Sequence, residues 1–428
     1  MRTNPPCAVL SGLILSFCSI QAQTQPKDRS LETRPRTVTP VQQSQPAPVP
    51  TKQMELEPAG TPLEAGSGPA APLAAPPRST EEHVPGAPVR LSAATVRTRI
   101  GEAERLLKTR PLPTALTLPS IEFVTLAALD RATARIHLIM LPKQTFLQRG
   151  AEVSLTTSEG ALVNLRILRA NGVNTAVTIF DNSGNALAPL VVQFPIEKGG
   201  VFREMAYYTS AHPALLSKEL VRSGQNYVRS MLDLAAKRLR DKGVFISPQI
   251  VDVAERLSIV EHIDHERFRS ENRLALYDEI YSLYALNELD TYRYSVSSAG
   301  AGGMVQMIPW AYNLMRQRHP AVGLTPDFVA GMRNHSNALQ AMLLYMQDTW
   351  NDLTANDEVK TALDSKTATP AELLAAGYNS NAARLPGYLR RGGDGWRTLI
   401  PRETQMYLQI YKSFESLVPL KSKTPETN

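Results

Sequence analysis

Cysteine is almost absent from this chain of 428 residues, which contains only Cys7 and Cys18. Because both lie close to the N-terminus, a disulfide framework, a zinc–thiolate centre and a thiol nucleophile are all excluded beyond residue 18. The rest of the chain must therefore be held together by packing alone.

Apolar runs long enough to span a membrane are also missing. Ala8–Ile20 is apolar and follows the positive charge of Arg2, but it is too short to cross a bilayer comfortably as a helix. We interpret residues 1–22 as a signal peptide cleaved near Ala22, with an uncleaved N-terminal anchor as the alternative. The protein is then expected to be exported to the periplasm or the cell exterior, or tethered to the membrane if the segment is retained.

Aromatic residues make up only 6% of the chain, and residues 23–90 contain no Phe, Tyr, Trp or Ile. Proline is concentrated there instead, since fourteen of the 32 prolines lie between Pro26 and Pro88. Such a segment buries too little apolar surface to offset chain entropy. We therefore predict that residues 23–90 are a disordered Pro/Ala-rich linker that acts as an extended spacer.

Ordered structure is predicted from residue 91 onward. A short helical segment over 91–113 precedes a region, 114–208, in which apolar and polar residues alternate with the period of strands. Asn171-Gly172 is typical of a hairpin turn between two of them. The expected strands lie at 135–141, 152–156, 161–168, 173–180 and 187–194. Five or more short antiparallel strands predict a small β-sandwich, for which we expect the role of a spacer or of a module that binds a protein partner.

Helical periodicity replaces alternation over 209–268, which we predict to be a helical connector. The expected helices are 214–242, stopped by Gly243, and 248–262. The segment Glu261–Glu266 gathers metal-ligand types of side chain, but no third ligand completes a pattern, so structural roles are favoured over a metal site. No metal and no cofactor is predicted.

Three motifs lie in the helical region that follows. The first begins with Glu288, at the end of an expected helix over 274–288, and runs through a glycine-rich turn to Pro309. The motif residues are Glu288 with Ser297, Gly300, Gly303, Gln306 and Ile308; Tyr378 with Asn379; and Glu403 with Tyr407. In this order and spacing, over residues 270–415, they resemble the soluble lytic murein transglycosylase family, whose catalytic domain is lysozyme-like.

The resemblance implies an all-α, lysozyme-like transglycosylase domain over 269–418, followed by a tail, 419–428. The whole chain is then a multidomain α+β protein in which the sandwich precedes the helical domain. The resemblance also implies that Glu288 is the catalytic residue. It further implies substrate contacts at Ser297, Gln306, Ile308, Tyr378 and Asn379, and structural roles for Gly300, Gly303 and Glu403.

The chemistry of glycoside cleavage explains why a carboxyl is needed. The departing oxygen requires a proton, and a carboxyl supplies it at neutral pH only when its pKa is raised. A groove walled by Met304 and Ile308 would desolvate Glu288 in this way. In the family resembled, the acetamido group of the substrate replaces a second carboxylate, and the sugar O6 closes a 1,6-anhydro ring. Asp290 keeps a lysozyme-type hydrolase open as an alternative.

Two further alternatives concern the purpose of the same fold. One is a non-catalytic protein that binds or scaffolds peptidoglycan, and the other is a wall-opening enzyme of a secretion or pilus machine. The net charge of +6 favours binding to anionic partners, but it does not distinguish between cell wall, membrane surface and nucleic acid. We expect peptidoglycan strands and, through the sandwich, a protein as partners, and no nucleic acid. Trp310, Trp350 and Trp396 are interpreted as core residues, with sugar stacking as the alternative.

Overall fold

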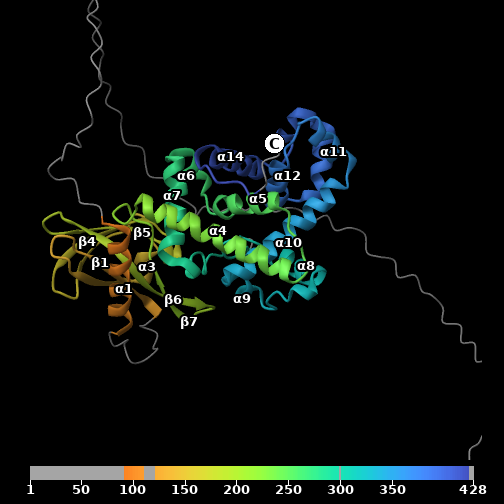
Figure 1. Ribbon diagram of the computed structural model, residues 1–428. Helices are drawn as coiled ribbons and strands as arrows, with labels where there is room; N and C mark the ends of the chain where they lie inside the picture. The colour runs from red at the N-terminus through yellow and green to blue at the C-terminus, as the bar shows by residue number, and fades with distance from the viewer. Residues whose placement is uncertain (1–90, 110–120, 298–299, 424–428) are drawn as a thin grey trace, which may run out of the picture. The chain divides into compact units, whose positions relative to one another are not determined.

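A computed structural model describes residues 91–109, 121–297 and 300–423 (Figure 1). The predicted signal peptide and linker, and the last residues of the predicted tail, lie outside the described residues. The described chain has a mixed α+β architecture, with one antiparallel sheet followed by a helical part. In the described residues, no helix combines the length and apolarity needed to cross a membrane.

The sheet has seven strands in the order β2-β1-β6-β5-β4-β3, with β7 paired to β6. They are β1 (Phe123–Leu129), β2 (Ile136–Pro142), β3 (Glu152–Thr156), β4 (Leu162–Arg169), β5 (Ala176–Asp181), β6 (Ala186–Lys198) and β7 (Val201–Tyr208). The two ends of the order approach each other, because the Ser158 N–H after β3 donates to the Leu138 carbonyl of β2 at 2.9 Å. The sheet is therefore a nearly closed barrel.

The predicted two-sheet sandwich is thus corrected to one curled sheet, and the long strand β6 is the reason. One edge of β6 pairs with β1, while its other edge pairs first with β5 and then with β7. A single strand that serves both halves joins them into one hydrogen-bonded surface. The predicted hairpin around Gly172 is confirmed as the β4–β5 pair, although a short 3-10 turn, Gly172–Asn174, makes the connection.

Burial explains which strands the sequence revealed. In β4, Val163, Leu165 and Ile167 point inward and their neighbours outward, so alternation is clear. β1 is buried on both faces, because helix α1 (Ala93–Thr109) packs Val96 and Leu107 on the side away from the barrel interior. A strand covered on both faces loses its alternation, and β1 was not predicted. Helix α1 confirms the predicted helical segment.

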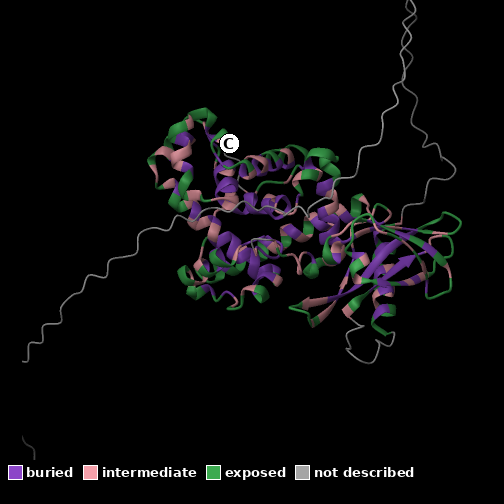
Figure 2. Cartoon of the chain, turned by 180° about the vertical axis from the view of Figure 1, so that it is seen from behind, coloured by how far each residue is buried: buried purple, intermediate pink, exposed green. Residues whose placement is uncertain are grey.

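The helical part has one hydrophobic core (Figure 2). Its helices are α4 (Lys218–Asp241), α5 (Pro248–Val260), α6 (His265–Ser270), α7 (Arg273–Asn287), α8 (Pro309–Arg318), α9 (Phe328–Arg333), α10 (His335–Thr354), α11 (Asp357–Asp364), α12 (Pro370–Asn379), α13 (Leu385–Gly392) and α14 (Arg402–Leu417). Val228 and Leu232 of α4 and Ile250 of α5 belong to this core. The two helices predicted as a connector therefore share the core of the helices after residue 269.

Helix α7 joins the helical part to the sheet. Its Leu283 packs in the core of the barrel, and its Glu279 forms an ion pair with Arg169 of β4 at 2.9 Å. Glu204 of β7 is bound by Arg333 of α9 at 2.5 Å and by Arg293, in the loop after α7, at 3.4 Å. The loop after α7, which carries the first motif, therefore lies at the junction of the two parts.

Candidate functional site

Helix α7 ends at Asn287, one residue before the predicted end, and Glu288 follows it as the C-cap in an unusual backbone conformation. The φ angle of Glu288 is 45° and its ψ angle is −117°, a combination that residues with a Cβ rarely adopt. Such a conformation costs on the order of 1–3 kcal/mol and persists only where the surroundings enforce it. Backbone strain at a residue with a reactive side chain marks it as a functional candidate.

The carboxylate of Glu288 faces solvent. Glu288, Leu289 and Asp290 are all exposed, and within the described residues the Glu288 carboxylate has no hydrogen-bond or ion-pair partner. The predicted desolvation by Met304 is wrong for this structure, because Met304 is fully buried in the helical core, and Ile308 is only half-buried at the N-cap of α8. The carboxylate is free to meet a ligand, but the protein alone does not bury it.

The glycine-rich turn is held by the side chains of its own motif. The Oγ of Ser297 accepts from the Ala301 N–H at 3.0 Å. The Nε2 of Gln306 donates to the Gly303 carbonyl at 2.8 Å, and Gln306 is only 8% exposed. Gly300 and Gly303 both have positive φ angles, of 77° and 67°. The amide nitrogen of Gln306, predicted to contact substrate, therefore contacts the turn instead.

Gly303 is also required by a close approach of two backbones. A Cβ at this position would lie 2.4 Å from the carbonyl oxygen of Met332 in α9, too near for any side chain. The predicted structural role of Gly303 follows from this contact as well as from its positive φ.

The second and third motifs meet each other and the first. The hydroxyl of Tyr378 donates to the Val305 carbonyl at 2.7 Å. Asn379, the last residue of α12, accepts a hydrogen bond from Thr404 of α14 at 2.9 Å, next to the half-buried Glu403. The structure thus brings 304–306, 378–379 and 403–404 together, although they are far apart in the sequence.

His262 connects this group to the loop that follows Glu288. Its ring stacks on Tyr292, with centroids 3.4 Å apart and planes at 1°, and its Nε2 donates to the Met304 carbonyl at 2.9 Å. These contacts agree with the predicted structural role of His262 near a helix end. Its link between two segments of the first motif could not be seen in the sequence.

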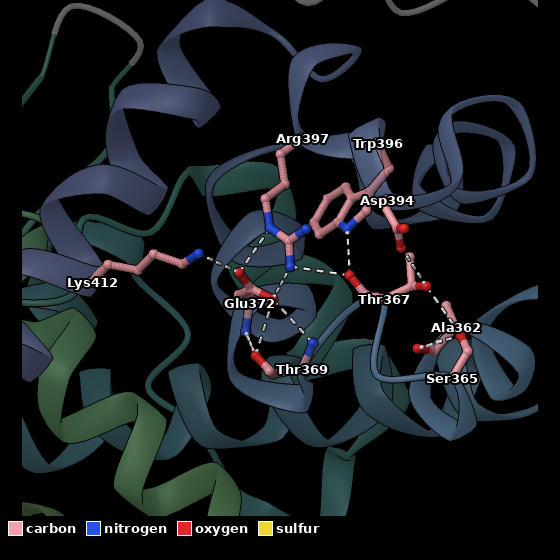
Figure 3. Close-up of polar contacts among 9 residues, drawn as sticks. All are labelled: Ala362, Ser365, Thr367, Thr369, Glu372, Asp394, Trp396, Arg397 and Lys412. Atoms are coloured by element: carbon pink, nitrogen blue, oxygen red, sulfur yellow. Dashed lines mark hydrogen bonds and ion pairs between the residues drawn. The ribbon is translucent and has the colours of Figure 1, made fainter.

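Helix α12, which presents Tyr378 and Asn379, is anchored at its start by a cluster around Glu372 (Figure 3). Thr369 and Glu372 form a capping box, and Arg397 and Lys412 bind the Glu372 carboxylate at 2.5 Å and 2.8 Å. Burial raises the pKa of Glu372, but the hydrogen bonds from Arg397 and Lys412 outweigh it and hold the pKa at about 2. The cluster was not predicted, although Thr369-Pro370 followed by Glu372 is a capping-box pattern.

Of the three tryptophans, Trp396 and Trp310 differ most in their exposure to solvent. Trp396 is fully buried, and its Nε1 donates to the Thr367 carbonyl, as expected of a core residue. Trp310, two residues after Ile308, is 59% exposed, so its interpretation as a core residue is wrong. A wide exposed indole next to the first motif offers a surface on which a sugar ring can stack.

Among the described residues, no three His, Cys, Asp or Glu side chains come together as a metal site. An open cavity of ≈ 400 Å³ lies elsewhere, lined by Arg238 and Lys242 at the end of α4 and by Asn334 and Gln340 near the start of α10.

The hydroxyl of Tyr378 gives a first prediction. We expect Tyr378→Phe to lower the free energy of unfolding by about 0.5–1.5 kcal/mol, because the Val305 carbonyl loses its donor. Urea unfolding measures the difference. Tyr388→Phe is the matched control, since no hydrogen bond of the Tyr388 hydroxyl is found in the described residues. Equal stability of the two variants would contradict the assigned role of the Tyr378 hydroxyl.

Two histidines predict the response to acid. Burial lowers the pKa of His262 to about 3 and that of His335 to about 4, from an ordinary value of 6.5. Between pH 6.5 and about 4 these two histidines take up protons in the unfolded chain but not in the folded chain. Their effect on stability is therefore absent above pH 6.5, and they destabilise the folded protein increasingly as the pH drops toward 4. We expect the melting temperature to fall by roughly 5–10 °C over this window.

The control for this pH response is His262→Gln, whose amide can still donate to the Met304 carbonyl but cannot take up a proton. This variant is expected to show a shallower fall in melting temperature between pH 6.5 and 4. A slope identical to that of the unaltered protein would show that His262 does not contribute to acid unfolding.

No family model matches the chain, and neither a curated protein nor a solved structure matches it.

Proposed function

We propose that this protein is an exported peptidoglycan lytic transglycosylase that cleaves the MurNAc–GlcNAc β-1,4 bond and forms 1,6-anhydroMurNAc. The observation that carries the proposal is the state of Glu288. It is a carboxylate on a strained turn, exposed and without a partner among the described residues. It lies at the start of a loop that contacts Tyr378, and the neighbouring Asn379 contacts Thr404. The order and spacing of the three motifs, which resemble the transglycosylase family, support the same function.

In the proposed reaction Glu288 acts first as acid and then as base. Its carboxyl gives a proton to the glycosidic oxygen as the bond from that oxygen to C1 breaks. The acetamido oxygen of the substrate assists at C1. The Glu288 carboxylate then takes the proton of the O6 hydroxyl as O6 bonds to C1, which closes the anhydro ring and restores the acid. The acetamido oxygen that bonds to C1 in the first step is displaced by O6 in the second, so it takes the place of a second protein carboxylate, and no water is consumed.

Substrate itself would complete the environment of Glu288. Because the carboxylate is exposed in the free protein, a glycan strand laid over the loop would exclude water from it, and this raises the pKa of a carboxyl. Exposed apolar side chains border the motif: Leu289, Val296 and Trp310 are exposed by 59%, 71% and 59%. Apolar sugar faces and N-acetyl methyl groups suit such a surface. We propose that Ser297 and Asn379 make polar contacts with the glycan strand and that Ile308 makes an apolar contact with it.

Digestion of purified peptidoglycan sacculi tests the proposal. The protein from residue 23 onward is incubated with sacculi, and the soluble products are analysed by mass spectrometry. Anhydro-muropeptides support a transglycosylase, since they are lighter than the hydrolysed products by one water. Reducing ends would instead identify a hydrolase, with Asp290 as the candidate second carboxylate.

A non-catalytic glycan-binding protein is the second candidate, and the exposure of Glu288 favours it. Catalytic carboxyls usually lie in desolvated surroundings, whereas the side chain of Glu288 is exposed. Co-sedimentation with sacculi in the absence of any released product would decide for this candidate. The barrel, which shows no convergent acids or histidines in the sequence, is proposed to bind a protein partner or to act as a spacer.

A further inference from the structure

His335 holds the far end of the turn that begins at Glu288. It is the first residue of α10, only 1% exposed, and its Nε2 lies 2.8 Å from the carbonyl oxygen of Thr291. Because a carbonyl oxygen only accepts, Nε2 carries a proton and donates it. Thr291 is fully buried, and its own N–H donates to the Glu288 carbonyl at 3.1 Å.

Tyr227 of α4 fixes the state of His335. Its hydroxyl lies 2.9 Å from Nδ1 of His335. Burial lowers the pKa of His335 to about 4, so the ring is neutral at pH 7 and Nδ1 is an acceptor. Burial raises the pKa of Tyr227, and the charges of Glu288 and Asp290 raise it further, so the phenol keeps its proton. Tyr227 therefore donates to His335, which donates to Thr291.

The near end of the turn is clamped from the barrel. The side chain of Asn287 accepts from the Thr209 N–H and donates to the Thr209 carbonyl, both at 2.8 Å. Thr209 directly follows strand β7. The backbone conformation of Glu288 is strained, and such strain persists only where both flanks are held.

We infer that Tyr227 and His335 are positioning residues for Glu288, which hold the Thr291 carbonyl and thereby keep the carboxylate in one place over the glycan. The inference rests on the proposed function, since position matters only if Glu288 reacts. Both residues lie outside the three motifs and come from helices α4 and α10. Tyr227 belongs to a segment first interpreted as a connector, so this role gives that helix a part in the reaction.

Two variants and one control test the inference. Tyr227→Phe removes only the hydroxyl, and His335→Gln keeps an N–H donor but loses the ring that aligns it. Tyr277→Phe is the control, because its hydroxyl also donates to a backbone carbonyl, that of Ile410 at 3.3 Å. Tyr277 lies in α7, the helix that precedes Glu288, but about three helical turns away from it.

Turnover of soluble uncrosslinked glycan strands is measured together with hydrogen exchange of peptides covering residues 284–295. For Tyr227→Phe we expect kcat to fall roughly two- to tenfold, the size of one hydrogen bond. For His335→Gln we expect a loss on the order of 10- to 100-fold from misplacement of the acid. KM should be unchanged in both, because the binding groups are untouched, and exchange at 284–295 should accelerate. The control should match the unaltered protein in kcat and in exchange of the peptides covering residues 284–295.

Unchanged kcat and unchanged exchange in Tyr227→Phe would overturn the inference while leaving the proposed function intact. A raised KM with normal kcat would also overturn it, since that result indicates substrate binding. If the unaltered protein releases no anhydro-muropeptides, the proposed function fails. The exchange data would then still show whether the pair holds the turn, so the two failures can be told apart.

Discussion

Glu288→Gln should leave the fold unchanged and reduce the release of anhydro-muropeptides by about 10²–10⁴-fold, the usual loss when general-acid catalysis is removed. The amide has the shape of the carboxyl but no proton to give. Stability should change little, because Glu288 is exposed and its carboxylate has no partner in the described part of the chain. Mass spectrometry of sacculus digests and thermal unfolding provide the two measurements.

Asp290→Asn is the matched control for this prediction. Asp290 is exposed, lies two residues from Glu288, and forms an ion pair with Arg293 at 3.5 Å. In a transglycosylase its amide variant should retain most of the activity. Loss of activity in both variants would point to a pair of carboxylates and to a hydrolase. Full activity of Glu288→Gln would remove Glu288 from the mechanism.

Gly224→Ala is expected to cause the largest loss of stability among single-methyl changes in the helical part. A Cβ at Gly224 of α4 would lie 1.8 Å from the carbonyl oxygen of Tyr281 in α7. This oxygen belongs to the backbone of a buried helix, so the two helices would have to separate. We expect a loss of at least about 3 kcal/mol, the upper end of the range for overpacking. Chemical and thermal unfolding would measure it.

Gly101→Ala in α1 is the matched control, because it is the same substitution within a helix and a Cβ there meets nothing within 4 Å. Alanine favours a helix over glycine by about 0.5–1 kcal/mol, so this variant should be slightly more stable. The two changes should therefore have opposite signs. If Gly224→Ala were also stabilising, the close α4–α7 contact would be incorrect.

Gly224→Ala also affects the site, because Glu288 directly follows α7 and Tyr227 lies in α4. Separation of the two helices would weaken the stacking of Tyr227 on Tyr284, whose rings are 6.0 Å apart. The molecules of this variant that still fold should therefore be less active than an equal amount of the folded unaltered protein.

Local patterns determined most of the secondary structure. The alternation of residues 152–156 and 161–168 predicted β3 and β4, because each strand has one exposed face and one inner face, which is half-buried in β3 and buried in β4. The 3.6-residue period predicted α4 and α7, and Ser247-Pro248 marked the start of α5. The glycine-rich stretch from Glu288 to Pro309 predicted a turn region between two helices, with an acidic residue at its start. These features depend on neighbours in the chain, so the sequence is sufficient to predict them.

Only the tertiary structure decided how these elements meet. The predicted sandwich is a nearly closed barrel in the structure, because β6 pairs with three strands. No short-range pattern in the sequence shows which strands will pair. Met304 lies in the core, so it does not cover Glu288, which is exposed. The side chain of Gln306 binds the glycine-rich turn. The Tyr227–His335 pair and the contact of His262 with Met304 join residues that are far apart in the chain. Such contacts arise from the packing of helices α4, α5 and α10 around one core, and packing depends on the shapes of all the side chains together.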